Sequence, residues 1–289
     1  MRSLLFVPGD SEKKLEKGLA SGADVLLIDL EDSVSAERKP AARQIAADFL
    51  KSNRDKSSPR LFVRINDLAS GLADADLGAV MPSLPHGILL PKSNNGKDVT
   101  RLSAKLNVHE AHADAAEGST RILAIITETA LGTLSAASYP DASARLVGLT
   151  WGAEDLSAVI GARAVRDDNG RYTDVFRLAR ALTILGASAA DVAAIDTVYI
   201  NYKDDAGLAR ECTEAERDGF TAKLAIHPAQ VPVINAVFTP SAEAVAQAQK
   251  IIRAFAEDPA AGVIGIDGLM FDRPHLRRAE RLMGRVGAA

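Results

Sequence analysis

The chain has 289 residues, of which 47% are hydrophobic and 25% charged, and it carries a net charge of -4 at pH 7. This composition is that of a globular protein, and the acidic balance argues against nucleic acid or a membrane surface as the main partner. The only cysteine, Cys212, excludes an internal disulfide, so we expect a cytoplasmic protein. The sequence contains no apolar run of about 18 residues, so no membrane-spanning helix is expected.

Eight short apolar runs follow one another along the chain, and each precedes a helix-like segment. The runs cover residues 4–7, 25–28, 61–63, 87–90, 121–128, 147–155, 195–200 and 223–226. Strands that alternate with helices at this spacing predict parallel βα units, and eight units in about 240 residues predict a (β/α)8 TIM barrel. A doubly wound open sheet is the second architecture. It would place a glycine-rich loop after the first strand, and Pro8-Gly9-Asp10-Ser11 is not such a loop.

The C-terminal part of the chain lies outside the eightfold pattern. We expect the barrel to occupy residues 1–256, and residues 257–289 to form an arm made of a loop and a helix. Gly262, Gly265 and Gly268 predict a loose loop, and a basic helix is expected over Pro274 to Met283. The arginines of this helix suit a solvated face, but an appended arm can also pack on a neighbouring subunit.

Polar side chains collect where the predicted strands end. They are Asp29, Glu31, Asp32, Arg64, Asn66, Lys92, Glu128, Asp155 and His227. In a barrel, the carboxyl ends of all strands meet at one mouth, which is where TIM-barrel enzymes place their active sites. Glu128 and Asp155 are oxygen donors that suit Mg²⁺, which takes one or two protein carboxylates and completes its shell with water and substrate. The alternative is that each acid caps the helix that follows it.

The guanidinium of Arg64 adds a positive group to this ring of acids. An arginine that faces a cation site is suited to hold a substrate carboxylate through two hydrogen bonds. An α-hydroxy or α-keto acid that chelates Mg²⁺ would fit, and this is chemistry of the aldol or Claisen type. Motifs for other chemistries are missing from the sequence. It has no Walker loop, no G-x-S-x-G and no C-x-x-C, and His109 and His112 lack the spacing of a zinc helix.

Several short motifs, taken in order, resemble those of a known family. They are RSLLFVPG at residues 2–9, DLEDSV at 29–34, VRIN at 63–66, LPK at 90–92, TETA at 127–130, GAEDL at 152–156, AIHPAQ at 225–230 and MFDRP at 270–274. The chain is similar to the HpcH/HpaI aldolase/citrate lyase family, and within it to the citrate lyase β-subunit-like branch, which includes malyl-CoA and citramalyl-CoA lyases. The similarity extends over nearly the whole chain.

This resemblance implies roles for individual residues. Glu128 and Asp155 would bind Mg²⁺, with Mn²⁺ as an alternative, and Glu128 would also contact the substrate. Arg64 would bind substrate oxygens, and Lys92 would contact the substrate or its thioester. Asp272, on the arm, would be the catalytic acid and base, often delivered to the site of a neighbouring subunit. Three further acids would hold metal-bound water and Arg64, namely Asp29, Glu31 and Asp32.

The resemblance also implies an activity and an assembly. The activity is a retro-Claisen cleavage of a 2-hydroxyacyl thioester, such as malyl-CoA, citramalyl-CoA or a citryl thioester, to an acetyl thioester and a keto acid. The thioester belongs to CoA or to an acyl carrier protein, and the expected assembly is a homotrimer or hexamer. Two alternatives stay open. One is a carrier-dependent β subunit of a citrate lyase complex, and the other is a class II aldolase that acts on free 2-keto acids.

Overall fold

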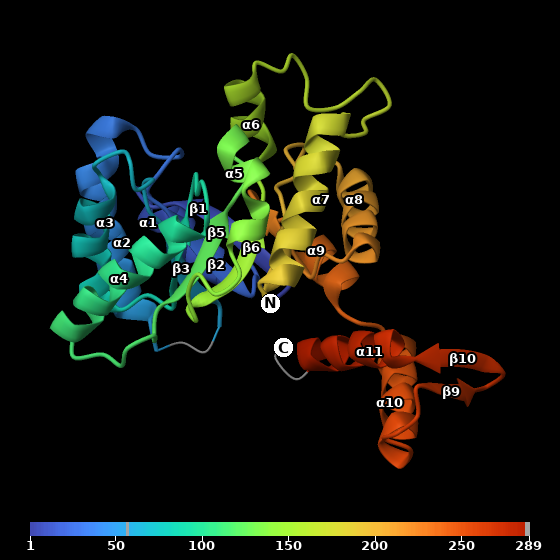
Figure 1. Ribbon diagram of the computed structural model, residues 1–289. Coiled ribbons are helices and arrows are strands. Elements are labelled where there is room, and N and C mark those ends of the chain that lie inside the picture. The colour runs from blue at the N-terminus through green and yellow to red at the C-terminus, as the bar shows by residue number, and fades with distance from the viewer. Residues whose placement is uncertain (56–57, 287–289) are drawn as a thin grey trace.

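Eight parallel strands close into a barrel in the computed structural model, which describes residues 1–55 and 58–286 (Figure 1). The strands follow one another around the barrel in chain order, and β8 pairs with β1 to close it. The predicted TIM barrel is therefore confirmed, and an open sheet is excluded. The strands are β1 (Ser3–Pro8), β2 (Val25–Asp29), β3 (Arg60–Arg64), β4 (Gly87–Leu90), β5 (Arg121–Ile125), β6 (Leu146–Thr150), β7 (Ala193–Asp196) and β8 (Ala222–Ala225).

Helices surround the barrel and cover the outer face of its strands. Each strand is followed by a helical segment, as the alternation in the sequence predicts. None of the helices in the described part of the chain is long and apolar enough to cross a membrane. The helices around the barrel are α1 (Glu12–Leu19), α2 (Lys39–Asn53), α3 (Ala73–Val80), α4 (Gly96–His112), α5 (Ala130–Leu134), α6 (Ala153–Ile160), α7 (Asp174–Ala189), α8 (Asp205–Asp218) and α9 (Gln230–Phe238), with short 3-10 helices at Ala36–Arg38, Met81–Ser83 and Ala136–Ser138.

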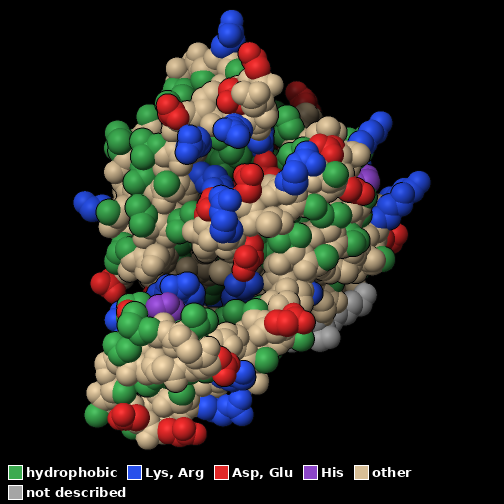
Figure 2. Space-filling view, turned by 90° about the vertical axis from the view of Figure 1, so that its right-hand side faces the viewer, with side chains coloured by type: hydrophobic (Ala, Val, Ile, Leu, Met, Phe, Trp, Pro, Cys, Tyr) green, Lys and Arg blue, Asp and Glu red, His purple; other side chains and the backbone are tan. Residues whose placement is uncertain are grey.

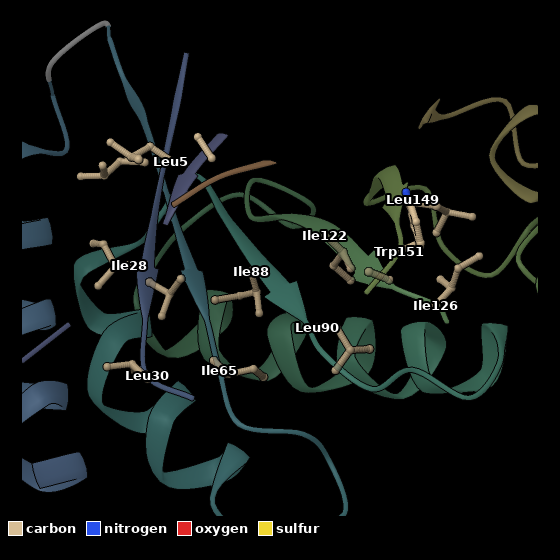
Figure 3. Close-up of a cluster of buried hydrophobic side chains, with 14 of the residues drawn as sticks. Leu5, Ile28, Leu30, Ile65, Ile88, Leu90, Ile122, Ile126, Leu149 and Trp151 are labelled. Carbon is tan, nitrogen blue, oxygen red and sulfur yellow. The ribbon is translucent and has the colours of Figure 1, made fainter. Parts of the chain in front are cut away.

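Two hydrophobic layers hold the barrel together, one inside it and one between the strands and the helices. Successive side chains of a strand point to opposite faces, so neighbouring residues enter different layers. On β1, Leu4 belongs to the inner layer and Leu5 to the outer one. Figure 3 shows the outer layer around Ile28, Ile88 and Ile122. Because both faces of each strand are buried, the strands are mostly apolar and appear in the sequence as nearly unbroken runs.

The seventh strand is shorter than its apolar run predicts. The run extends to Ile200, but β7 ends at Asp196. The carboxylate of Asp196 is buried and accepts a hydrogen bond from the Lys223 ammonium on β8 at 2.6 Å. After Asp196 the chain leaves the sheet as a loop that leads to α8.

The C-terminal segment folds into an arm with its own hydrophobic cluster. The arm consists of α10 (Ala242–Glu257), β9 (Val263–Ile266), β10 (Leu269–Asp272) and α11 (Arg273–Val286). The boundary expected after residue 256 falls within the last turn of α10. The buried face of α10 packs against the rest of the arm, so the whole helix is grouped with the arm. The cluster is formed by Ala248, Ile251, Phe255, Phe271 and Ala279.

The expected loose loop around Gly265 is wrong, because residues 263–272 form an antiparallel β-hairpin. Its turn is made by Asp267 and Gly268, whose φ angles are 51° and 79°. A two-residue hairpin turn of type I′ needs positive φ at both positions, and an Asp-Gly pair adopts it readily. The basic helix expected after the loop is present as α11.

The arm lies at the end of the barrel opposite to the carboxyl ends of the strands (Figure 1). Arg281 of α11 forms an ion pair with Asp191, 3.7 Å away, just before β7 begins. Arg285 donates a hydrogen bond to the carbonyl oxygen of Phe238, at the end of α9, over 3.0 Å. The arm is thus attached to the amino-terminal side of the barrel.

Candidate active site

Asp29 and Arg64 form a buried ion pair at the ends of β2 and β3. The two residues are partners in the strand register, so their side chains leave the sheet on the same face. Arg64 donates from Nε to Asp29 Oδ1 over 2.7 Å and from Nη2 to Oδ2 over 2.6 Å. Burial opposes the charge on Asp29, but the guanidinium outweighs burial and holds the pKa of the carboxyl below its ordinary value. The pair therefore stays ionised and fixes the orientation of the guanidinium.

Two more acids surround the guanidinium of Arg64. Its Nη1 atom lies 2.7 Å from Glu31 Oε2 and 3.5 Å from Asp32 Oδ2. Its central carbon lies 4.8 Å from the centroid of the Phe6 ring, which covers it from one side. Burial raises the pKa of Glu31 to about 7, although the charge of Arg64 favours the ionised form. The structure thus brings Asp29, Glu31 and Asp32 together around Arg64.

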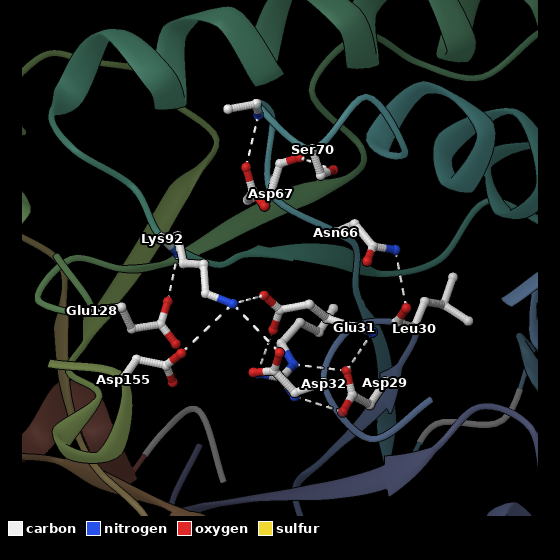
Figure 4. A network of polar contacts seen from close by, with 12 residues as sticks. Asp29, Leu30, Glu31, Asp32, Asn66, Asp67, Ser70, Lys92, Glu128 and Asp155 are labelled. Carbon is white, nitrogen blue, oxygen red and sulfur yellow. Dashed lines mark hydrogen bonds and ion pairs between the residues drawn. The ribbon is translucent and has the colours of Figure 1, made fainter. Parts of the chain in front are cut away.

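Lys92 connects these acids to the opposite side of the mouth (Figure 4). Its backbone N–H donates to Glu128 Oε2 over 2.5 Å. Its ammonium donates to Glu31 Oε1 over 2.5 Å and lies 3.4 Å from Asp32 Oδ1 and 3.6 Å from Asp155 Oδ1. One residue at the end of β4 therefore contacts acids that follow β2 and β5 and an acid at the start of α6.

Glu128 follows β5 and is only 3% exposed. Burial, together with the negative charges of Asp155 and Glu31, raises the pKa of Glu128 to about 8. A carboxyl group in such surroundings needs a proton or a cation beside it at neutral pH. Gly152 makes room for this side chain, because a Cβ atom at Gly152 would lie 2.7 Å from Glu128 Cγ.

Asp155 lies in the first turn of α6, and Figure 4 shows its carboxylate beside that of Glu128. The alternative role of Glu128 as a helix cap is wrong. Thr129 caps α5 instead, since its Oγ1 atom accepts a hydrogen bond from the N–H of Gly132 over 2.9 Å. The N-cap of α6 is Gly152. The Asp155 side chain is 33% exposed, so it is accessible from the mouth of the barrel.

Glu128 and Asp155 together fit a divalent cation that prefers oxygen. Within residues 1–55 and 58–286, no group of three or more His, Cys, Asp or Glu side chains is arranged to hold a metal ion. Mg²⁺ does not need such a group, because it accepts one or two carboxylates and keeps water or substrate oxygens in its other positions. The buried Glu128 carboxyl, whose ionised form is disfavoured by its neighbours, would be stabilised by a cation.

The structure does not bring Asp272 to this group of acids. Asp272 ends β10 in the arm, on the far side of the barrel from the mouth (Figure 1). A hydrogen bond with His275 lowers the pKa of Asp272, and 2.5 Å separate Asp272 Oδ1 from His275 Nδ1. The Asp272 side chain is 36% exposed and is accessible to another molecule.

A buried ionic network, to which the sequence pattern assigns no role, anchors the strand end that leads to Asp155. Trp151 Nε1 donates to Asp196 Oδ1 over 2.8 Å, and Lys223 Nζ donates to Asp196 Oδ2 over 2.6 Å. Lys223 also donates to Glu211 over 2.8 Å. The network fixes Trp151, which lies two residues before the start of α6. Its signal in the sequence is a charged residue within each of the last two apolar runs.

Two other residues expected at the mouth have structural partners. The backbone N–H and the Nδ2 atom of Asn66 donate to Asp76 Oδ2 over 2.8 and 2.7 Å. Asn66 therefore holds the loop that follows β3. His227 lies exposed after β8 and stacks on Tyr202, with 4.8 Å between the ring centroids.

A cleft of about 320 Å³ begins at Ala153 and Glu154, directly before Asp155. Its walls are mostly apolar, and Arg163 and Arg166 add positive charge. A cleft of this size has room for part of a small-molecule substrate. The other lining residues are Ser157, Ala162, Ala164, Val165, Tyr172, Val198 and Ile200.

Comparison with known proteins agrees with the resemblance of the motifs. A sequence model described as HpcH/HpaI aldolase/citrate lyase matches residues 2–228. The chain belongs to the HpcH/HpaI aldolase/citrate lyase family. Among HpcH/HpaI relatives, the citrate lyase subunit beta-like protein of Mycobacterium tuberculosis is 35% identical over 99% of this chain and 95% of its own length. The mitochondrial citramalyl-CoA lyase of Rattus norvegicus is 33% identical over 98% of this chain and 85% of its own length.

The same family is found among solved structures. The crystal structure of the protein CitE from Mycobacterium tuberculosis, in complex with magnesium, acetoacetate and coenzyme A, has a TM-score of 0.76 and is 33% identical in sequence. The match covers 99% of this chain and 98% of that one, so it includes the arm as well as the barrel. Barrel and arm are therefore a shared feature of this HpcH/HpaI member and the present chain.

Proposed function

We propose that this protein is a magnesium-dependent carbon–carbon lyase that cleaves a 2-hydroxyacyl thioester by a retro-Claisen reaction. Malyl-CoA, citramalyl-CoA and a citryl thioester are the candidate substrates, and the products would be an acetyl thioester and a keto acid. The observation that carries the proposal is the barrel mouth, where Lys92 contacts Glu128 and Asp155 and shares Glu31 with Arg64. The CitE complex with magnesium, acetoacetate and coenzyme A supports it.

Glu128 and Asp155 would hold Mg²⁺, with Mn²⁺ as an alternative. A cation bound there would supply positive charge beside the reacting oxygens of the substrate. Glu128 would also contact the substrate, because its carboxylate lies beside that of Asp155 and next to Lys92. Asp29, Glu31 and Asp32 would hold Arg64 and the water molecules around the cation.

Arg64 and Lys92 would bind and orient the anionic part of the substrate. The Arg64 guanidinium is held in place by Asp29 and Glu31 before any substrate arrives. A positive group that is fixed where negative charge develops stabilises the enolate, and loss of one such donor typically costs about 3 kcal/mol. The Lys92 side chain is 29% exposed, so its ammonium can meet a substrate at the mouth.

A single carboxylate can carry out both proton transfers of the reaction. It first takes the proton of the substrate hydroxyl group. The bond between the hydroxyl-bearing carbon and the carbon next to the thioester then breaks, a keto acid forms, and the electron pair passes to the thioester enolate. The carboxyl group finally returns the proton to the enolate carbon. We assign this role to Asp272, whose lowered pKa keeps it ready to act as the base.

Asp272 lies at the wrong end of its own barrel, so we propose that it acts in the site of a neighbouring copy within a homotrimer or hexamer. Barrel and arm both expose apolar side chains that an interface would bury, and Leu134 is 79% exposed. Figure 2 shows hydrophobic side chains on the surface of both parts. The exposed residues are Leu131, Leu134, Val159, Ile160, Val175, Leu178 and Leu185 on α5, α6 and α7, and Val263, Leu269 and Met270 on the hairpin.

The second candidate is a carrier-dependent β subunit of a citrate lyase complex, which the name of the Mycobacterium tuberculosis relative favours. Such a subunit would act on a carrier-bound thioester and would not turn over free CoA esters. A class II aldolase for free 2-keto acids would not bind CoA.

Cys212 is buried and unpaired, which suits the reducing cytoplasm that we propose as the location.

Cleavage of CoA esters tests the proposal directly. With Mg²⁺ present we expect turnover of at least one of malyl-CoA, citramalyl-CoA and citryl-CoA, followed as keto acid released and acetyl-CoA formed. Removing the cation with EDTA should stop the reaction, because charge on the substrate oxygens is then no longer stabilised. Turnover that persists in EDTA would contradict the magnesium site. Turnover of carrier-bound substrate alone would favour the citrate lyase subunit.

The affinity for Mg²⁺ should rise with pH up to about pH 8, because the cation competes with the proton on Glu128. Displacement of one proton makes the dissociation constant about tenfold larger for each pH unit below that value. Calorimetric titrations with Mg²⁺ at several pH values measure this slope. A dissociation constant that does not change with pH would contradict Glu128 as a ligand.

The same carboxyl group should make the metal-free protein less stable as the pH rises from about 4.5 to 8. The pKa of Glu128 in the folded state lies above its ordinary value of 4.5, so in this window the folded protein keeps a proton that the unfolded chain has lost. Stability must fall where the folded state binds more protons. The unfolding temperature of the metal-free protein, measured at several pH values, checks this trend. An unfolding temperature that rises through this window would contradict it.

A further inference from the structure

Lys92 contacts both candidate ligands of the cation. Its backbone N–H donates to Glu128 over 2.5 Å, and its ammonium pairs with Asp155 over 3.6 Å. In the part of the chain that the structure describes, no other cation pairs with Asp155. The ammonium also pairs with Glu31 and Asp32 on the other side of the mouth. Figure 4 shows it at the centre of these four acids.

The backbone of Lys92 fixes this position. Lys92 follows Pro91 directly after β4. Its φ of 50° places it in the left-handed region, which residues other than glycine and asparagine adopt at a cost. This conformation directs the N–H to Glu128 while the side chain extends across the mouth toward Glu31. The ammonium donates a hydrogen bond to Glu31, and a lysine carries its positive charge at neutral pH.

We propose that the Lys92 ammonium competes with the divalent cation, neutralising the acids of the metal-free site and giving up Asp155 when the cation binds. The inference rests on the proposed function, because it takes Glu128 and Asp155 as the ligands. Two positive charges a few ångström apart repel each other strongly in such surroundings. When the cation binds, the ammonium can leave Asp155 and keep its contacts with Glu31 and Asp32, which lie 2.5 and 3.4 Å away. Lys92 thus weakens metal binding and holds the empty site together.

The replacement of Lys92 by Met separates this role from a structural one. Methionine has a similar length and the same unbranched Cβ, so it meets the same backbone constraint without a charge. We expect Lys92→Met to bind Mn²⁺, used as the paramagnetic probe, about tenfold more tightly, which corresponds to about 1.4 kcal/mol. Its metal-free form should unfold at a lower temperature, and Mg²⁺ should raise that temperature more than in the unchanged protein. A residue with a merely structural role would lose affinity when replaced, not gain it.

Three further variants complete the experiment. Lys92→Gln is neutral as well, and the same gain in affinity is expected, so the test survives if the methionine variant does not fold. Lys92→Arg keeps the charge and Lys97→Met removes the charge of an exposed lysine nearby, so both should bind Mn²⁺ within a few-fold of the unchanged protein. Binding is measured by electron paramagnetic resonance at the same pH for all variants and the unchanged protein.

The outcomes distinguish the inference from the function on which it rests. If the unchanged protein and Glu128→Gln both fail to bind Mn²⁺, the proposed metal site is wrong, and the inference that depends on it is wrong as well. If the unchanged protein binds Mn²⁺ and Glu128→Gln does not, the metal site stands. In that case, equal or weaker binding by both neutral Lys92 variants would overturn the inference alone.

Discussion

Replacing Glu128 by Gln should abolish thioester cleavage, with a loss of about a thousandfold or more in kcat/KM. The amide has nearly the same shape as the carboxyl group but carries no negative charge. It therefore cannot replace water around Mg²⁺ as a carboxylate does, and it cannot neutralise the charge of the cation. Binding of Mg²⁺, measured by calorimetry, should become undetectable at concentrations that saturate the unchanged protein. The metal-free variant should be at least as stable as the unchanged protein above pH 5, because a buried carboxyl group with a pKa raised to about 8 is removed.

This gain in stability is what makes the experiment specific. A variant that lost activity by unfolding would melt at a lower temperature, whereas loss of the cation leaves the barrel intact and removes only the temperature shift that Mg²⁺ induces. Glu16→Gln, on the exposed face of α1, removes the same charge far from the mouth and serves as the control. Wild-type activity in Glu128→Gln would show that the cation is held by other groups or not needed.

Mixing two inactive variants should restore activity if the arm acts in a neighbouring copy. In a ring of subunits, Glu128→Gln supplies an intact Asp272, and Asp272→Asn supplies an intact mouth. Among trimers that contain both chains, one site in three combines an intact mouth with an intact arm, so about a third of the normal activity should return. The two variants are co-expressed with different tags, purified through both tags, and assayed at equal total protein.

The alternative geometry gives a different result. If Asp272 reached the mouth of its own chain, every site would be built from one chain and would lack either Glu128 or Asp272. No activity would then return. Mg²⁺ binding is the matched control, because Asp272→Asn should bind the cation normally while Glu128→Gln does not. Arg64→Ala is a poor choice for this test, since it would leave Asp29 buried without its counter-charge at a cost of about 3–5 kcal/mol.

The barrel and the meeting of its acids were predictable from the sequence for one physical reason. Parallel strands place their carboxyl ends at one rim, so the order of apolar runs was enough to bring Glu128 and Asp155 to the same opening. The pairing of Asp29 with Arg64 follows in the same way, from equal positions on neighbouring strands. These features depend on the periodicity of the strands, which the sequence displays directly.

Other features depend on contacts that periodicity does not encode. The position of Asp272 is set by the packing of α10 and α11 around Phe255 and Phe271, residues that give no sign of the direction in which the arm extends. The place of the Lys92 ammonium depends on a left-handed backbone, which no residue type at that position announces. Three glycines within seven residues predict a loop, whereas Asp267 and Gly268 form the turn of a hairpin and the flanking residues pair as strands.

Trp151 is the only tryptophan of the chain, and it stands four residues before Asp155 with its indole N–H bound to Asp196. Its ring lies 5.0 Å from that of Tyr172, centroid to centroid, and is wholly buried. The tryptophan fluorescence of the chain, excited at a wavelength that tyrosine does not absorb, therefore originates from a single indole next to the first turn of α6. The protein carries its own optical reporter, so cation titrations and melting curves can be recorded without any added dye or label.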